Sequence, residues 1–257
     1  MLFDWLLKPI RQSRRQRLLS TPFPTSWQTW LDRLPFYAAL DTRGQKRIKD
    51  DLRVLVEEKD WEGCGGLEMT DEVRVTIAAQ ACLLILNIEH DYFHRVTSIL
   101  VYPAAYKTMP SRGRDGVVRE GQANLGEAWL RGPVVLSWDD ARHGALDPKD
   151  GHNLVFHEFA HKLDMLDGAA DGTPPLANQE TLRQWVQTMT REFAALREAA
   201  DRGRATVLDT YGATNPAEFF AVATECFFEK ARQLRQRHRS IYELLKDYYQ
   251  QDPAARQ

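Results

Sequence analysis

Hydrophobic and polar residues recur with helical spacing over most of the chain. This spacing predicts helices over 44–58 and 72–89, and the second is apolar enough to lie inside a core. The segments 96–106 ("VTSILVYPAAY") and 132–138 ("GPVVLSW") are short apolar runs and are predicted strands. The Gly- and Arg-rich segment 110–121 between them is a predicted loop.

After the second predicted strand, the chain is helical almost to its end. The segment around "HEFAH" has Asp147 as a candidate N-cap, Pro148 at the first helical position and Gly168 just past the last turn. Three further helices are predicted: 179–200, one that begins near Pro216, and 240–251. Strands followed by a run of helices favour an α+β fold without internal repeats.

The composition is typical of an ordinary globular protein. The 257 residues are 43% hydrophobic and 27% charged, which is enough to form a sizeable core. A formal net charge of -2 lacks the basic excess that nucleic acid or a membrane surface demands, so neither is an expected partner. No run approaches the ~20 apolar residues of a membrane span. We therefore expect a cytoplasmic protein.

The cysteines and the basic N-terminus carry no chemistry in this interpretation. Cys64, Cys82 and Cys226 lie far apart, so they suggest neither a disulfide framework nor a thiolate zinc site. The basic run from Arg11 to Arg17 is expected to be a solvated arm.

The pentapeptide "HEFAH" places two histidines four residues apart, with a glutamate directly after the first. Because a helix turns about 100° per residue, His157 and His161 lie about 40° apart on one face and can reach one ion. A catalytic zinc site has three protein ligands and leaves the fourth position to water. Glu158 points beside the metal, where it can take a proton from that water.

Three acidic residues are candidates for the third ligand. Asp164 follows His157 by seven residues, but a rigid helix holds its short carboxylate a turn beyond the histidines. Glu218 and Glu225 share one face of a later helix. Glu218 is favoured because it follows "TNP", where a loop can deliver the helix end to the site. Asp164 and Glu225 then remain to accept from the outer ring N–H groups of the histidines.

Tyr211 and a second histidine pair need separate consideration. Tyr211 stands seven residues before Glu218, where a phenol can donate to the oxygen that gains charge when a carbonyl is attacked, although a packing role is equally open. His90 and His94 repeat the spacing of four, but Asp91 stands where the base would be and no third ligand is evident. That pair is expected to be ordinary polar residues at a helix end.

The remaining histidines are His143, His152 and His238. They are isolated in the sequence, and we expect them to face solvent.

Five segments, in the same order, resemble the Mlc titration factor A family: "VYPAAY", "GPVVLSW", "NLVFHEFAHKLDMLDG", "DTYGATNPAEFFAVATECFF" and "YYQQDP". The resemblance covers roughly residues 35–253. Members of this family are bacterial cytoplasmic zinc peptidases whose catalytic core is similar to that of anthrax lethal factor. The resemblance therefore implies a zincin-like core.

Carried over residue by residue, the resemblance implies His157, His161 and Glu218 as zinc ligands and Glu158 as the general base. Tyr211 matches the tyrosine that steadies the transition state. The resemblance also implies one Zn²⁺ per chain, aminopeptidase-like activity on small substrates, and binding and inactivation of the glucose-responsive transcription repressor Mlc.

One position departs from the family. Some members carry a histidine near the metal in the loop before the "GPVVLSW" strand, and this chain has none between His94 and His143. The departure argues against a closed, four-ligand resting site and leaves the three-ligand site untouched.

The sequence thus predicts a zinc-dependent peptidase. Residues 1–34 are a basic arm, and 35–257 are a single zincin-like domain with a helical part over 35–95 and a catalytic part over 96–257. The strand 132–138 offers an edge to which an extended peptide substrate can add. The alternative is a non-enzymatic protein that binds the repressor and has a structural or vestigial zinc site. The open fourth zinc position favours the enzyme.

Overall fold

The computed structural model describes residues 4–104, 111–112, 118–119 and 132–256. Its longer helices are α1 (Asp4–Ser20), α4 (Thr42–Glu58), α5 (Asp71–Leu84), α7 (Trp138–Leu146), α8 (Leu154–Asp164), α9 (Gln179–Asp201), α10 (Pro216–Glu229) and α12 (Arg239–Tyr249). Shorter helical segments are α2 (Thr25–Leu31), α3 (Pro35–Ala38), η1 (Met165–Asp167), η2 (Thr210–Ala213), α11 (Ala231–Arg237) and η3 (Pro253–Ala255). The strands are β1 (Asp60–Gly63), β2 (Ser98–Tyr102), β3 (Ser111–Arg112), β4 (Val118–Arg119) and β5 (Val134–Ser137).

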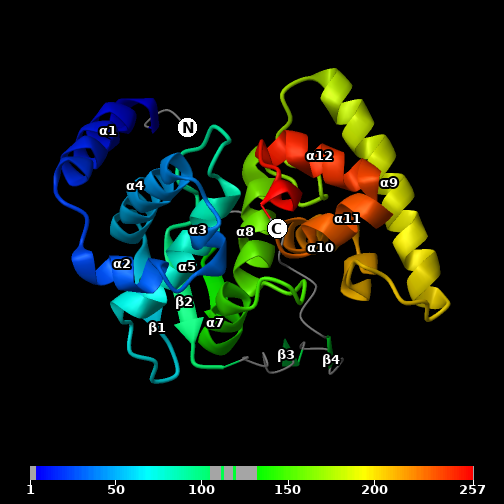
Figure 1. Cartoon of the computed structure of the whole chain (residues 1–257), viewed down its shortest axis with the longest axis horizontal. Helices are drawn as coiled ribbons and strands as arrows, with labels where there is room; N and C mark the ends of the chain where they lie inside the picture. Colours follow the sequence, from blue (N-terminus) through cyan, green and yellow to red (C-terminus); the bar gives the residue numbers. More distant parts are fainter. Residues whose placement is uncertain (1–3, 105–110, 113–117, 120–131, 257) are drawn as a thin grey trace.

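The helix α8 runs through the middle of the molecule. The helices α4 and α5 and the sheet lie on one side of it, and α9 to α12 lie on the other (Figure 1). It packs directly against both α5 and α10. None of the helices in the described residues combines the length and the apolar character that a bilayer crossing needs.

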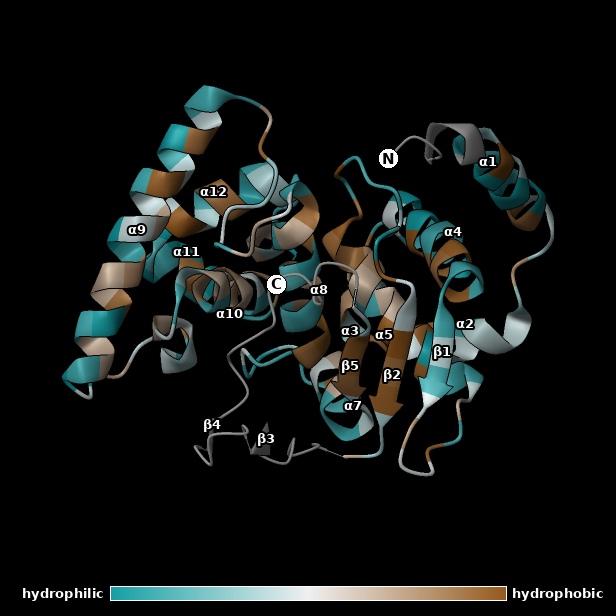
Figure 2. Ribbon diagram, turned by 180° about the vertical axis from the view of Figure 1, so that it is seen from behind, coloured by the Kyte–Doolittle hydropathy of each residue, from teal (hydrophilic) through white to brown (hydrophobic). Residues whose placement is uncertain are grey.

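A small parallel sheet packs against α8 on the same side as α4 and α5 (Figure 1). Its order is β1-β2-β5, and Ile99 of β2 pairs with Val134 of β5. The side chains of Ile99, Val101, Val134 and Leu136 are buried, as expected where helices cover a parallel sheet. Figure 2 shows β2 and β5 as hydrophobic strands and β1 as the polar one. The chain is therefore mostly helical with a small sheet before α8, as predicted.

The two predicted strands are present but short. The first covers Ser98–Tyr102, and the second ends at Ser137 because the Ser137 hydroxyl accepts from the Asp140 N–H at 3.3 Å and starts α7. The helix α7 was not predicted. Most of the predicted loop 110–121 lies outside the described residues, but β3 and β4 within it pair antiparallel, contrary to a continuous loop.

Two helix ends were predicted wrongly. The helix α5 ends at Leu84 rather than at Glu89, because the apolar residues Ile85 and Leu86 continue the core in an irregular segment. The N-cap of α8 is Asn153, not Asp147. The Asn153 side chain accepts from the Phe156 N–H at 3.0 Å, while Asp147 caps the C-terminus of α7.

The other predicted helix ends agree with the structure. Gly168 follows the last turn of the α8–η1 segment with a φ of 108°, a conformation that favours glycine. Pro216 begins α10 after the N-cap Asn215. The predicted helices 179–200 and 240–251 correspond to α9 and α12 within two residues at each end.

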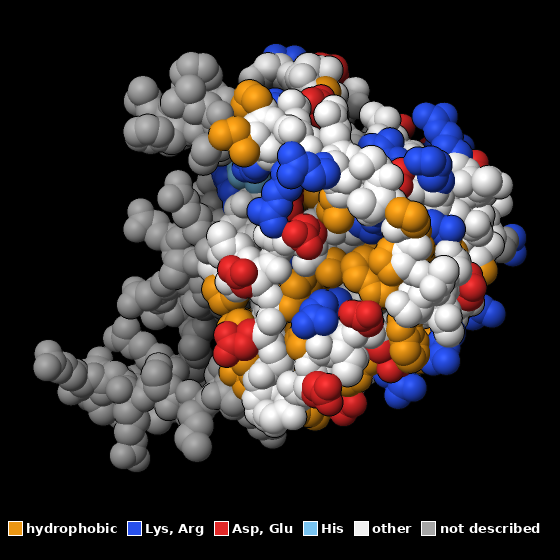
Figure 3. Space-filling view, turned by 90° about the vertical axis from the view of Figure 1, so that its left-hand side faces the viewer, with side chains coloured by type: hydrophobic (Ala, Val, Ile, Leu, Met, Phe, Trp, Pro, Cys, Tyr) orange, Lys and Arg blue, Asp and Glu red, His pale blue; other side chains and the backbone are white. Residues whose placement is uncertain are grey.

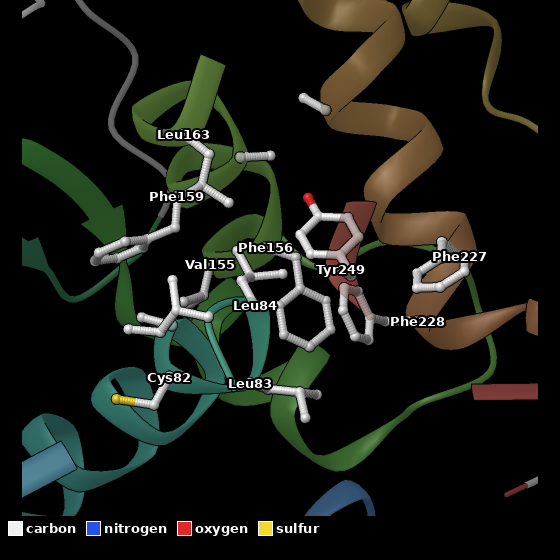
Figure 4. Close-up of a cluster of buried hydrophobic side chains, with 14 of the residues drawn as sticks. Cys82, Leu83, Leu84, Val155, Phe156, Phe159, Leu163, Phe227, Phe228 and Tyr249 are labelled. Atoms are coloured by element: carbon white, nitrogen blue, oxygen red, sulfur yellow. The ribbon is translucent and has the colours of Figure 1, made fainter. Parts of the chain in front are cut away.

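Apolar side chains fix the buried side of α8 (Figure 4). Val155, Phe156, Phe159 and Leu163 of α8 lie between residues of α5 and the aromatic residues of α10 and α12. The rings of Phe156 and Phe228 have their centroids 5.2 Å apart. Because the surrounding interior is close-packed, α8 has little freedom to shift or rotate.

The sequence predicts that the basic N-terminal run is a solvated arm, and this prediction is wrong. The run forms α1, which packs on α4. Arg15 donates to Glu58 with two nitrogens, each at 2.7 Å, and to Asp91 at 2.5 Å. On this side of the molecule, Figure 3 shows Lys and Arg side chains interspersed with Asp and Glu side chains. Further along, Leu31 and Leu34 are fully buried in the same core as the residues after 35.

We predict that Arg15→Met lowers the free energy of unfolding by about 2 kcal/mol, because it leaves the partly buried Glu58 carboxylate without its partner and removes one of the cations that pair with Asp91. Urea denaturation measures this difference. Arg14→Met is the matched control, since Arg14 forms one exposed pair with Glu57 and should cost less than about 1 kcal/mol. Equal effects of the two substitutions would contradict the docking of α1 through Arg15.

Candidate metal centre

Three side chains from α8 and α10 converge at one point. His157 Nε2 lies 2.9 Å from Glu218 Oε2, His161 Nε2 lies 3.4 Å from the same oxygen, and the two ring nitrogens are 3.2 Å apart. These three residues form one of two groups in the described residues whose ligand atoms could hold a metal ion. These are the three residues that the sequence predicts as ligands.

The spacing of these atoms fits a zinc ion. Ligands at about 2.0–2.1 Å in a tetrahedral shell lie about 3.3 Å from one another. The three observed distances, 2.9, 3.2 and 3.4 Å, are close to the edges of one face of that tetrahedron. Two imidazole nitrogens and one carboxylate oxygen form a donor set that suits zinc.

The loop after α8 holds the two ligand helices together. The Gly172 N–H donates to Asp164 Oδ2 at 2.9 Å, and the Trp185 indole donates to the Gly172 carbonyl at 2.9 Å. A Cβ at Gly172 would lie 2.3 Å from the Pro216 carbonyl oxygen, so the loop touches the start of α10 there. This contact fixes the helix end that carries Glu218.

The charges of the site depend strongly on one another. Burial lowers the pKa of His157, but hydrogen bonds to Glu218 and Glu225 outweigh it and raise that pKa to about 10. Burial raises the pKa of Glu218, but hydrogen bonds from His157 and His161 outweigh it and lower that pKa to about 2. In the metal-free protein, the His157 imidazole therefore carries a proton at the place where a metal ion fits.

The two remaining acidic candidates differ. Glu225 Oε1 lies 2.7 Å from His157 Nδ1, the outer ring nitrogen, so it is positioned to orient this ring. Asp164 is fully buried but forms no hydrogen bond with His161. Its Oδ1 and His161 Nδ1 both lack a hydrogen-bond partner within the described residues.

Glu158 and Tyr211 line a pocket of about 410 Å³ together with His157, one of the three candidate ligands. Burial raises the pKa of Glu158, opposed by the charges of His157, His161 and Lys162. A raised carboxyl pKa favours a group that both takes and returns a proton near neutral pH. The Tyr211 ring lies 6.0 Å from the His157 ring and is 55% exposed, so its hydroxyl is accessible to a bound molecule.

The other histidines do not join this site. His90 and His94 are in the segment after α5, and His90 Nε2 lies 3.7 Å from Asp51 Oδ2 of α4. Neither histidine belongs to a candidate metal-binding group of the described residues. His143 and His152 are exposed, as expected, and His238 is half-buried beside Glu192.

His143 is not isolated, because its Nε2 lies 2.8 Å from Asp150 Oδ2. With Asp147, these two residues form the second candidate group, and two of its three members are exposed.

A buried polar network behind the site was missed from the sequence. Asn153 Nδ2 donates to Gln80 Oε1 at 2.9 Å and to Glu229 Oε1 at 3.0 Å. The Asn153 N–H donates to Glu225 Oε2 at 2.5 Å. The spacing of Glu218, Glu225 and Glu229 along one helix face was the available signal for Glu229.

Comparisons with known proteins show the family of this chain. The profile of the family described as glucose-regulated metallo-peptidase M90 matches residues 10–250. The chain belongs to the M90 metallopeptidase family. Since the relatives of this chain include Mlc titration factor A proteins, the resemblance stated from the sequence is confirmed.

Three relatives illustrate the similarity over nearly the whole M90 chain. An uncharacterized protein of Synechocystis sp. is 40% identical over 244 residues, which are 93% of this chain and 89% of the relative. Mlc titration factor A of Serratia proteamaculans is 32% identical over 234 residues, 88% of each chain. Mlc titration factor A of Yersinia pestis is 30% identical over 228 residues, 87% of this chain and 83% of the relative.

A metal-binding prediction follows from the raised pKa of His157. At pH 7 its imidazole is protonated in the metal-free protein, whereas a metal ligand must be neutral. Zinc binding at pH 7 should therefore release about one proton per ion, and the affinity should rise as the pH approaches 10. Calorimetry in buffers of different ionisation enthalpy counts these protons.

The control for this measurement is Glu225→Gln, which keeps the shape of the hydrogen bond but removes a charge that raises the pKa of His157. The variant should release fewer protons than the unaltered protein at pH 8–9. A binding enthalpy that is the same in all buffers would contradict the assignment.

We also predict that Asn153→Ala lowers the free energy of unfolding by about 3 kcal/mol, because it removes an N-cap and leaves Gln80 and Glu229 with unsatisfied buried oxygens. The matched control is Asn178→Ala, which removes an exposed N-cap of α9 and should cost about 1 kcal/mol. Thermal or urea denaturation compares them. Similar losses for both would show that the buried network adds nothing.

Proposed function

We propose that this protein is a zinc-dependent peptidase in which His157, His161 and Glu218 bind the metal. The observation that supports this best is the convergence of their ligand atoms, all within 3.4 Å of one another. A bound zinc ion supplies Lewis-acid polarisation of the scissile carbonyl and lowers the pKa of water. Membership of a metallopeptidase family is consistent with this chemistry.

The side chains around the metal perform the proton transfers. Glu158, which lines the pocket next to His157, takes the proton from the attacking water and later gives it to the leaving amine. The Tyr211 phenol donates to the carbonyl oxygen as that oxygen gains negative charge. Glu225 holds the His157 ring in the tautomer that leaves Nε2 free for the metal.

The substrate we propose is a short peptide, cleaved in an aminopeptidase-like way. The pocket of about 410 Å³ is in the range of pockets that bind small molecules, which suits a short peptide. Within the described residues, β5 pairs only with β2, so its other edge is available for an extended peptide. The strand β5 also contacts α8, the helix that carries His157 and His161.

We further propose that residues 35–257 form a single domain with a zincin-like core, preceded by the basic region 1–34. The order of sheet, HExxH helix and ligand helix supports this assignment. The shared core of α5, α8 and α10 supports one domain for the part after residue 35.

A partner is proposed from the relatives. Two of them are named Mlc titration factor A, so we propose that this protein also binds a transcription repressor of the Mlc type. The second candidate function is repressor binding alone, with a structural or vestigial zinc site. The open pocket beside the candidate ligands favours the enzyme over this alternative.

We predict that Glu158→Gln keeps one zinc ion per chain and lowers kcat/KM on short aminoacyl substrates by a factor of about 10²–10⁴, because it removes the general base. Metal analysis and an activity assay check both parts. Glu180→Gln, an exposed glutamate on α9, is the control for a charge change and should keep full activity. A Glu158→Gln variant that stays active would rule out this base.

Glu218→Ala separates the ligand assignment from the base assignment. It should lose zinc, and full zinc occupancy would move the third-ligand role to Glu225 or Asp164. Measuring how Glu158→Gln and Glu218→Ala bind the repressor distinguishes the two candidate functions. Binding that needs zinc, in a protein that cleaves no member of a peptide library, would favour repressor binding alone.

A further inference from the structure

A second pocket lies at the C-terminal end of α10, whereas the candidate ligand Glu218 is in the first turn of this helix. The pocket has a volume of about 540 Å³ and is formed by α3, the loop before α8, the α10–α11 junction and the C-terminal segment η3. Figure 1 shows the C-terminus beside α10 near the middle of the molecule. The volume is in the range of pockets that bind small molecules.

Positive charge dominates the lining of this pocket. Lys149, Lys230, Arg232 and Arg256 contribute to it, and Glu229 is the one acidic residue of the lining. Glu229 is buried, and its two carboxyl oxygens accept from the Gly151 N–H and from the Asn153 side chain. Four cationic side chains and one carboxyl group thus line the pocket, and both oxygens of this carboxyl group already accept hydrogen bonds.

Three of the four cations, Lys149, Lys230 and Arg256, have no carboxylate partner among the described residues, and Arg256 donates to the amide oxygen of Gln251. Within the described part of the chain, the ammonium groups of Lys149 and Lys230 form no ion pair. Lys230 is half-buried, and its side chain lies against Gly151, where an added Cβ would be 2.7 Å from Nζ. A half-buried ammonium group without a counter-charge attracts an anion more strongly than an exposed one.

The rest of the lining is apolar. Phe36, Leu83 and Phe228 contribute side chains, together with three prolines. Phe228 and Leu83 belong to the buried core, so this wall is rigid and preformed. The pocket therefore offers an apolar surface next to positive charges.

A pocket of equal volume elsewhere on the molecule has the opposite character. It lies between the segment after α5 and the helices α9 and α12, and Glu89, Asp91 and Asp247 are among its lining residues. The difference in charge allows the two pockets to be distinguished by one ligand.

We propose that the basic pocket at the α10–α11 junction binds a small organic anion that has an apolar body. The anionic group pairs with Lys149 and Lys230, and the apolar body contacts Phe36 and Phe228. The proposal does not depend on peptidase activity, because none of these residues belongs to the metal centre.

The test uses 8-anilinonaphthalene-1-sulfonate as the probe and the full chain loaded with zinc. Fluorescence titration should give one saturable site. The double variant Lys149→Gln with Lys230→Gln should weaken binding at least about tenfold, because each charge-assisted contact contributes on that scale. Binding should also weaken as salt is added.

Two controls separate charge from apolar contact. The uncharged analogue N-phenyl-1-naphthylamine should bind equally to the unaltered protein and to the double lysine variant, while Phe36→Ala should weaken both probes. Asp247→Asn, in the acidic pocket, should leave the affinity for the sulfonate probe unchanged. Thermal denaturation verifies that each variant is folded.

An unchanged affinity of the sulfonate probe for the double lysine variant would overturn the proposal. So would an equal loss for the charged and the uncharged probe, since the lysines would then act on the shape of the pocket and not on the anion. Tighter binding of the sulfonate probe to Asp247→Asn, which removes a charge that repels it, would place the probe in the acidic pocket and would also refute the assignment.

Discussion

The packing of α8 against α10 is the contact on which the metal centre depends. It brings two histidines and several carboxylates into a small buried volume, where Glu225 and Asp164 are almost inaccessible to water. Burying such charges is costly unless each has a counter-charge or a hydrogen bond. In the metal-free protein a proton on His157 provides part of that compensation. A divalent cation in the same place supplies more positive charge than this single proton, so the buried carboxylates of the fold favour an occupied site.

The rest of the structure holds these two helices in register. Asn153 caps α8 and is tied to α5 through Gln80 and to α10 through Glu229, so one side chain connects three helices. At the other end of α8, Asp164 and Gly172 fasten the helix to the start of α10. Apolar packing fills the space between these two polar attachments. Hydrogen bonds at both ends of α8 and close apolar packing between them therefore fix the positions of the ligands. A preorganised site requires such support.

Local signals explain what was predictable from the sequence. Helix geometry alone placed His157 and His161 on one face, and the "TNP" sequence before Glu218 identified a helix start. The N-cap of α8 was misplaced because Asp147 and Asn153 are both good caps, and only the fold of the intervening turn decides between them. The docking of α1 depends on Glu58 and Asp91, which are distant in the sequence. Asp164 Oδ2 accepts from the Gly172 N–H, and this contact depends on the fold of the loop after α8, which no local signal in the sequence predicts.

The helix α10 also separates the two sites that the structure points to. Glu218 is in its first turn and Glu229 is its last residue, so at 1.5 Å per residue the metal centre and the basic pocket are about 16 Å apart along the helix. An anion in the basic pocket therefore cannot touch the metal ligands. It does contact the lining that contains Glu229, and Glu229 holds the cap of α8. Any influence of one site on the other must pass through α10 and Asn153, because these are the groups that both sites share.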